Sequence, residues 1–152
     1  MTDDTIGVIL PCYNEEDWIE GAIESVLDQT YKQFELQIVD DGSTDRTADI
    51  IKGFSDPRIR YIYQENGGHP SALNTGLDLL DTEYYAIIDA DDRWYPNKLE
   101  RQIQHHKSTD AKLTHTNAVY IDTEGNQIGK QHTKKPPNPN SNKEFALELF
   151  YN

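Results

Sequence analysis

The 152-residue sequence contains a single cysteine, and this scarcity restricts both its chemistry and its location. One thiol, Cys12, cannot form an internal disulfide. Neither Cys12 nor the five scattered histidines show the spacing of a zinc site. Because structural disulfides belong to oxidising compartments, we expect this chain to reside in a reducing, cytoplasmic environment.

Long apolar runs and an excess of basic residues are also missing. No run approaches the roughly 18 apolar residues of a membrane-spanning helix, and the amino terminus lacks a signal-peptide pattern. Because 27 acidic residues outnumber 14 basic ones, the formal charge of −13 disfavours binding to nucleic acid or to anionic membrane surfaces. We expect any association with the cytoplasmic face of a membrane to come from segments outside this chain. The acidity suits ordinary solubility and a salt-rich cytoplasm equally.

Hydrophobic residues make up 36% of the chain, which is enough for a core, and their pattern alternates between strand and helix. Short apolar runs at 5–10, 34–39, 59–63 and 84–88 predict buried strands. Apolar residues at helical spacing predict the connecting helices: Ile19, Ala22, Ile23, Val26 and Leu27, then Ala48, Ile51 and Phe54, then Ala72, Leu73, Leu77 and Leu80. This order predicts an α/β fold, with a mostly parallel sheet flanked by helices.

The pattern changes after Pro96. A helix is predicted at 97–106, and a strand at 113–121 followed by a hairpin turn at 122–126 predicts an antiparallel addition. Residues 134–142 are polar and proline-rich, which is typical of a loop, and residues 144–151 form an apolar helical pattern. Because an apolar helix at a chain end must pack somewhere, we expect the natural protein to continue past Asn152.

An acidic turn, Asp89-Ala90-Asp91-Asp92, follows the last of the predicted parallel strands. Like charges a few ångströms apart repel by roughly 1 kcal/mol in water and by more in a partly dry cleft. Oxygen donors of this kind suit Mg²⁺ or Mn²⁺, which bridge one or two carboxylates to nucleotide phosphates. A solvated acidic turn is the alternative, and the string alone does not decide between the two.

Two more loops follow predicted strands, at residues 11–16 and 40–45. In open α/β sheets ligands bind outside the carboxyl ends of the strands, so these loops and the acidic turn are expected to converge. Asp41 could accept a hydrogen bond from an N–H edge such as the imide of uracil, and Tyr13 could lie against a base or ribose. The alternative for the second loop is helix capping by Ser43 or Thr44.

Four strings in this order resemble family 2 glycosyltransferases of the Rossmann-like GT-A fold. They are residues 11–15 (PCYNE), 39–45 (VDDGSTD), 66–76 (from NGG to NTG) and 89–92 (DADD), with Pro96 and Leu99 after them. Each string is weak alone, but the order and the positions at strand ends make the set specific. The resemblance extends across roughly residues 5 to 121.

The resemblance implies a role for each string. Tyr13 and Asp41 would contact base and ribose, Asp91 would bind the metal ion, Asp89 would approach ribose and metal, and Asp92 would lie near the sugar. The residues implied to bind the nucleotide-sugar are Pro11, Tyr13, Glu15, Asp41, Asn66, Ser71, Asn74, Asp89, Ala90 and Asp91.

The implied reaction is transfer of a sugar from a nucleoside diphosphate, with a UDP-sugar favoured, to a hydroxyl of a glycan or lipid-linked acceptor. The implied cofactor is Mn²⁺ or Mg²⁺, the expected outcome is inversion, and the expected setting is polysaccharide or cell-surface glycan biosynthesis. No general base is recognisable, although Asp92 is a candidate contributor. We assign residues 1–133 to an incomplete nucleotide-sugar-binding core and 134–152 to a loop and terminal helix, and we allow for a homo-oligomer.

Two other kinds of protein are alternatives to an active transferase. A receiver-like phosphoacceptor domain is disfavoured because its acidic pair would follow the first strand, which here ends in Pro11, Cys12 and Tyr13. A truncated nucleotide-sugar or metal-binding module, inactive because it lacks the base, agrees with the transferase on Asp41 and Asp91 and differs only in turnover.

Overall fold

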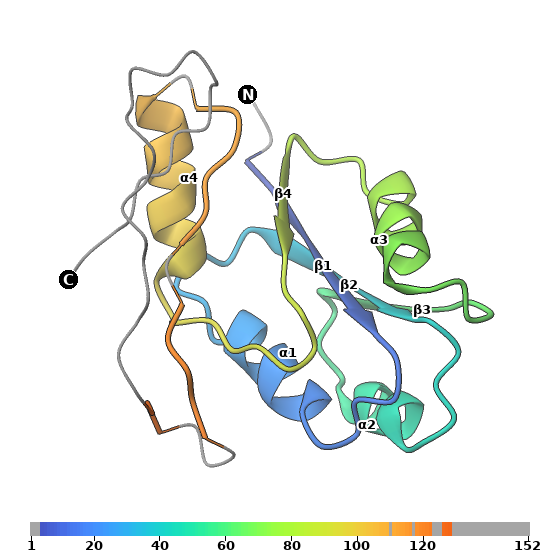
Figure 1. Ribbon diagram of the computed structural model, residues 1–152. Helices are drawn as coiled ribbons and strands as arrows, with labels where there is room; N and C mark the ends of the chain where they lie inside the picture. Colours follow the sequence, from blue (N-terminus) through green and yellow to red (C-terminus); the bar gives the residue numbers. More distant parts are fainter. Residues whose placement is uncertain (1–3, 110, 117, 123–125, 129–152) are drawn as a thin grey trace. The chain divides into compact units, whose positions relative to one another are not determined.

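The computed structural model describes residues 4–109, 111–116, 118–122 and 126–128 (Figure 1). The chain divides into two compact units, residues 1–97 and residues 98–152. The predicted parallel strands and the helices that connect them all lie in the first unit. Within the described residues, no helix combines the length and the apolar character needed to cross a membrane.

A four-stranded sheet forms the centre of the first unit. Its strands are β1 (Ile6–Cys12), β2 (Phe34–Asp40), β3 (Ile59–Tyr63) and β4 (Tyr84–Ile87), in the spatial order β3-β2-β1-β4. All neighbouring pairs are parallel. Every residue of β1 is buried, as expected for an internal parallel strand that is covered on both faces. The predicted parallel sheet is therefore confirmed.

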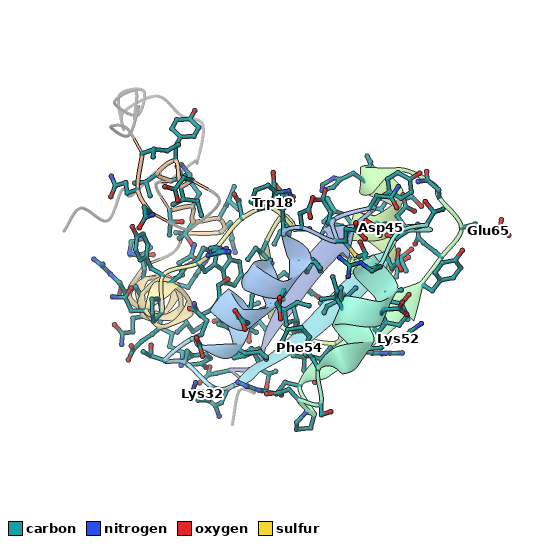
Figure 2. The ribbon with its side chains drawn as sticks, turned by 90° about the horizontal axis from the view of Figure 1, so that it is seen from below. Trp18, Lys32, Asp45, Lys52, Phe54 and Glu65 are labelled. Carbon is teal, nitrogen blue, oxygen red and sulfur yellow. The ribbon has the colours of Figure 1, made fainter. Side chains whose placement is uncertain are left out.

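Three helices connect these strands: α1 (Ile19–Leu27), α2 (Thr47–Gly53) and α3 (His69–Asp78). The apolar face of α1 that helical spacing predicted is buried. α1 and α2 contact each other on one side of the sheet, and α3 covers the other side (Figures 1 and 2). Right-handed crossovers require this arrangement, because the chain reverses its direction of travel across the sheet between β3 and β4.

The contact between α3 and β1 is close. A Cβ atom added at Gly76 of α3 would lie 2.5 Å from Cγ2 of Ile9 in β1. Such a distance is shorter than any van der Waals contact, so the helix reaches this separation from the sheet only because residue 76 has no side chain. The fixed position of α3 also fixes its amino-terminal end, which begins at His69.

The second unit contains α4 (Lys98–Ser108), which confirms the helix predicted at 97–106. The predicted antiparallel addition to the sheet is not seen among the described residues. Among the described residues of 113–121, only Ile121 takes part in a bridge, an isolated antiparallel pairing with Gln127. Leu113 and Tyr120 are exposed, so the apolar residues of this segment do not bury the face that would hold it as a strand. The loop and terminal helix predicted at 134–152 lie outside the described residues.

Candidate functional site

A cavity of ≈ 570 Å³ lies at the carboxyl ends of β1, β2 and β4. Sheet order reverses at β1, and this is where open α/β sheets bind ligands. Twelve residues from five segments of the first unit line the cavity: Pro11, Cys12, Tyr13, Glu15, Asp41, Asn66, Gly68, His69, Ala72, Asp89, Ala90 and Asp91.

Most of the site residues predicted from the sequence meet in this cavity. Those that line it are Pro11, Tyr13, Glu15, Asp41, Asn66, Asp89, Ala90 and Asp91. Ser71 and Asn74 are not among the lining residues. The hydroxyl of Ser71 instead accepts a hydrogen bond from Gln64, and Asn74 is exposed on α3. The four other lining residues, Cys12, Gly68, His69 and Ala72, were not among the site residues predicted by number, although Gly68 belongs to the string 66–76 that the resemblance implicated.

The loop after β1 is held by the loop after β2. Asn14, at φ 56°, accepts a hydrogen bond from Thr44 N through its side-chain oxygen (2.8 Å), and its own N–H donates to the Ser43 hydroxyl (3.0 Å). Glu15 N donates to Oγ1 of Thr47 at 2.8 Å. These contacts fix the loop at Asn14 and Glu15, and thereby position the cavity-lining residues Tyr13 and Glu15. They also show that Ser43 and Thr44 bond to Asn14 and do not cap α2, which begins at Thr47. The first N–H of α2, that of Thr47, instead donates to Oδ1 of Asp45 at 2.9 Å, so the same loop does bind the start of the helix, through Asp45.

Asp41 is a buried carboxylate that the protein itself holds in place. Its Oδ1 accepts hydrogen bonds from Nε2 of Gln64 (2.6 Å) and from Gly67 N (2.9 Å), and its Oδ2 accepts one from Gly68 N (2.8 Å). Burial raises the pKa of Asp41, but these hydrogen bonds outweigh burial, so the pKa lies below its ordinary value. Asp41 is therefore an ionised acceptor facing the cavity.

The acidic turn follows β4 and lines the cavity on the other side of β1 from Asp41, which follows β2. Asp89 lies 3.2 Å from Nε2 of His69, and both side chains are more than half exposed. Burial, and then the charges of Asp91 and Asp89, raise the pKa of Asp92. Burial, and then the charge of Asp91, raise the pKa of Glu15. Burial is the larger cause of both pKa shifts, and the remainder comes from repulsion between neighbouring carboxylates, which a cation would relieve.

The fit of a divalent metal ion follows from this donor set. Asp89 and Asp91 present carboxylate oxygens to the cavity, which is the ligand type that Mg²⁺ and Mn²⁺ prefer. In the part of the chain that the structure describes, no cluster of at least three His, Cys, Asp or Glu side chains could hold a metal ion. The residues present therefore fit an ion that takes its remaining ligands from water and from the phosphates of a nucleotide.

The segment after the acidic turn lies along α1. One hydrogen bond joins it to α1, from Trp94 N to Oγ of Ser25 (3.1 Å). Two more join it to the turn after α1: Nε2 of Gln29 to Tyr95 O (2.8 Å), and Thr30 N to Pro96 O (2.7 Å). A Cβ atom at Gly21 would lie 2.6 Å from the guanidinium of Arg93. Residues 21 and 25 lie about one turn apart on α1, and residues 29 and 30 follow its end. The chain immediately after Asp92 is therefore anchored by α1 and by the turn that follows α1.

Cys12 lines the cavity but is not poised for chemistry. Its Sγ donates to Val39 O at 3.7 Å, and the side chain is buried. Burial, followed by the charges of Asp40 and Glu15, raises the pKa of the thiol above its ordinary value. A protonated thiol is a poor nucleophile and a poor metal ligand, so Cys12 fills space beside the site.

A parallel α/β sheet flanked by helices, with a cavity at the carboxyl ends of its strands, is the architecture of the GT-A glycosyltransferase fold. The family model described as glycosyl transferase family 2 matches residues 7–151. The chain therefore belongs to glycosyl transferase family 2. The expectation drawn from the four strings is confirmed at the level of family and fold.

Similar proteins agree with this assignment. The putative teichuronic acid biosynthesis glycosyltransferase TuaG of Bacillus subtilis is 37% identical over 128 residues, which are 82% of this chain and 51% of TuaG. The mannosyltransferase PcManGT of Pyrobaculum calidifontis, solved with GDP-Man and Mn²⁺, is 32% identical at a TM-score of 0.55, over 59% of this chain and 28% of that one. TarS of S. aureus, residues 1–349 with UDP, has a TM-score of 0.71 over 86% of this chain and 38% of that one, and its 23% identity shows the fold alone. The chain spans between 14% and 53% of the curated relatives that it matches.

Proposed function

We propose that this chain binds the donor of a glycosyltransferase that moves a sugar from a nucleoside diphosphate to an acceptor hydroxyl with help from a divalent cation. One observation supports the proposal above all: a single cavity is lined by the fixed acceptor Asp41 on one side of β1 and by the carboxylates of Asp89 and Asp91 on the other. The complex of PcManGT with GDP-Man and Mn²⁺ supports this chemistry.

Tyr13 and Asp41 would bind the nucleoside. The Tyr13 ring is 47% exposed in the cavity, so a base or ribose can cover it and remove apolar surface from water. Asp41 is ionised and can only accept hydrogen bonds, so it would bind an N–H of the base. An acceptor at this position favours a base with an N–H on its edge, which suits a UDP-sugar.

Asp91, with Asp89, would hold the ion on the diphosphate. When bound, Mn²⁺ or Mg²⁺ supplies Lewis-acid stabilisation of the charge that develops on the departing nucleoside diphosphate. The two aspartates would orient the diphosphate by fixing where its oxygens bind. His69, which already lies 3.2 Å from Asp89, would keep that carboxylate from turning away from the cavity.

Fewer residues of this chain bear on the acceptor than on the donor. We propose a glycan or lipid-linked acceptor, an inverting transfer, a role in cell-surface glycan synthesis as the TuaG likeness suggests, and a cytoplasmic location. Asp92, which directly follows Asp91 and is exposed, stays our candidate to assist the acceptor hydroxyl, although it does not line the cavity. If the chain alone binds donor without turnover, the binding-module alternative holds.

Calorimetric titration tests the donor site. We expect UDP to bind the wild-type chain only when Mn²⁺ is present, and Asp91→Asn and Asp41→Asn each to weaken binding at least about tenfold. Asp78→Asn is the matched control, because this exposed carboxylate lies at the opposite end of α3 from the cavity. Equal UDP affinity in wild type and Asp91→Asn, without metal dependence, would show that the metal assignment is wrong. A donor-hydrolysis and transfer assay on the same proteins then separates turnover from binding.

A further inference from the structure

Gln64 directly follows β3, and both polar atoms of its side chain form hydrogen bonds. Its Nε2 donates to Oδ1 of Asp41 at 2.6 Å and to the hydroxyl of Ser71 at 3.1 Å, and its Oε1 accepts from the hydroxyl of Thr75 at 2.6 Å. The carboxylate of Asp41 can only accept, so the amide nitrogen must face it and the amide has one permitted orientation. Gln64 is thus locked between Asp41 and the first turns of α3.

The hydrogen bonds on Asp41 leave little capacity for a ligand. A carboxylate offers about four lone-pair sites, two on each oxygen. Gln64 and Gly67 N occupy both sites on Oδ1, and Gly68 N occupies one on Oδ2. One site on Oδ2 is left to receive a hydrogen-bond donor from the cavity, so the rotation of this carboxylate decides where a nucleobase N–H can bind.

The same contacts determine the shape of the loop before α3. Gly68 has φ 84°, and a Cβ at Gly67 would meet the Ser71 hydroxyl at 2.6 Å. The two glycine N–H groups at the start of α3 both point to Asp41 and are not offered to a phosphate. Gln64 therefore connects three parts of the site: the carboxylate after β2, the glycine loop, and α3.

We propose that Gln64 is a positioning residue that orients Asp41, and through Asp41 sets the affinity for the nucleobase of the donor without affecting the diphosphate end. This inference rests on the proposed function, since it requires that Asp41 binds the base. Gln64 is separated from Asp41 by 23 positions in the chain and does not line the cavity. Of the three side chains that it holds, Asp41, Ser71 and Thr75, only Asp41 lines the cavity, so the carboxylate is its direct connection to a bound base.

Two ligands distinguish the two ends of the site: UDP, which has a base, and inorganic pyrophosphate, which has none, each with Mn²⁺. For Gln64→Met, a side chain of similar length without a donor, we expect UDP affinity to fall about tenfold and pyrophosphate affinity to stay within about twofold of wild type. Glu65→Met is the matched control, because Glu65 is exposed and projects away from the molecule in Figure 2.

A second pair of variants covers the case in which Gln64→Met fails to fold. Thr75→Val removes the hydroxyl that fixes Oε1 of Gln64, and Thr75→Ser keeps it. We expect a loss of UDP affinity of a few-fold for the valine variant, wild-type affinity for the serine variant, and faster amide hydrogen exchange at Gly67 and Gly68 only in the valine variant.

The possible results separate the role of Gln64 from the proposed function. Equal loss of UDP and pyrophosphate binding, or UDP binding and exchange rates unchanged in both Gln64→Met and Thr75→Val, would overturn the positioning role while leaving the donor site intact. Failure of the wild-type chain to bind UDP while it still binds pyrophosphate would instead overturn the proposed function, and the role of Gln64 with it.

Discussion

Asp40 and Asp41 are adjacent and chemically identical, yet their surroundings give them different roles. Asp40 is fully buried, and its two oxygens accept from Ser43 N (2.8 Å) and from the hydroxyl of Tyr61 (2.7 Å). Burial and then this hydrogen bond raise the pKa of Tyr61, so its phenol stays protonated and keeps donating. Asp40 therefore stabilises the loop after β2, and Asp41, which lines the cavity, is the one available to a ligand.

A third carboxylate, Asp56, permits a prediction of how stability depends on pH. It accepts hydrogen bonds from Arg58 N (2.9 Å), Nε (2.9 Å) and Nη2 (2.7 Å), which lower its pKa from 3.8 to about 2. Because the folded state binds this proton more weakly than the unfolded state, the interaction stabilises fully above about pH 4 and is lost as pH falls toward 2.

For Asp56→Asn we therefore expect the free energy of unfolding to fall by about 1 kcal/mol at pH 7, since the pair is partly exposed, and the difference from wild type to shrink below pH 4. Urea denaturation at pH 7, 4 and 3 measures this, with Asp78→Asn as the control. A difference that is the same at pH 7 and pH 3 would contradict the assigned cause.

At the scale of elements, the packing of α3 on β1 positions the amino-terminal end of α3 beside the cavity. The lack of a side chain at Gly76 allows this approach, since a Cβ there would lie 2.5 Å from Ile9. Alanine is a better helix former than glycine by about 1 kcal/mol, so propensity alone predicts that Gly76→Ala stabilises the protein.

We expect the opposite: overpacking should lower the free energy of unfolding by about 1–3 kcal/mol. Gly53→Ala is the control, because a Cβ at the end of α2 meets no atom within 4 Å and should be neutral or stabilising. Thermal and urea denaturation of both variants measure the difference. If Gly76→Ala were as stable as Gly53→Ala, the helix would have moved away from the sheet at little cost.

At the scale of the whole molecule, the formal charge of −13 is the dominant long-range term. Like charges that are brought together on folding repel, and salt screens them over a Debye length of about 10 Å at 0.1 M. We expect the melting temperature to rise by several degrees between about 20 and 300 mM NaCl, since roughly 1 kcal/mol corresponds to about 2–4 °C for a chain of this size.

Choline chloride is the control for that experiment, because a bulky cation screens charge without binding as a metal ion does. The same rise in both salts, retained in Asp91→Asn, is expected from general screening. A rise in NaCl alone would point to a specific sodium site.

The sequence predicted the parallel sheet and the convergence of its loops because both follow from local patterns and from the rule for strand ends. The partners of Asp41 were not predictable in that way. Gln64, Gly67 and Gly68 come 23 to 27 positions later, and no local pattern indicates which loop will turn toward a carboxylate. The expected strand at 113–121 is not seen among the described residues for a related reason, since a short apolar run does not specify which strand it will pair with.

The charges around the cavity have one more consequence. Among the described residues that line it are four carboxylates, Glu15, Asp41, Asp89 and Asp91, and neither lysine nor arginine. His69, which also lines the cavity, is paired with one of these carboxylates, Asp89. A diphosphate arriving alone would meet net repulsion from the four carboxylates, and a divalent ion arriving alone would find fewer than three clustered ligands among the described residues. Donor and cation would then bind with positive cooperativity, because each raises the affinity of the site for the other. The free cation concentration would set how much donor is bound.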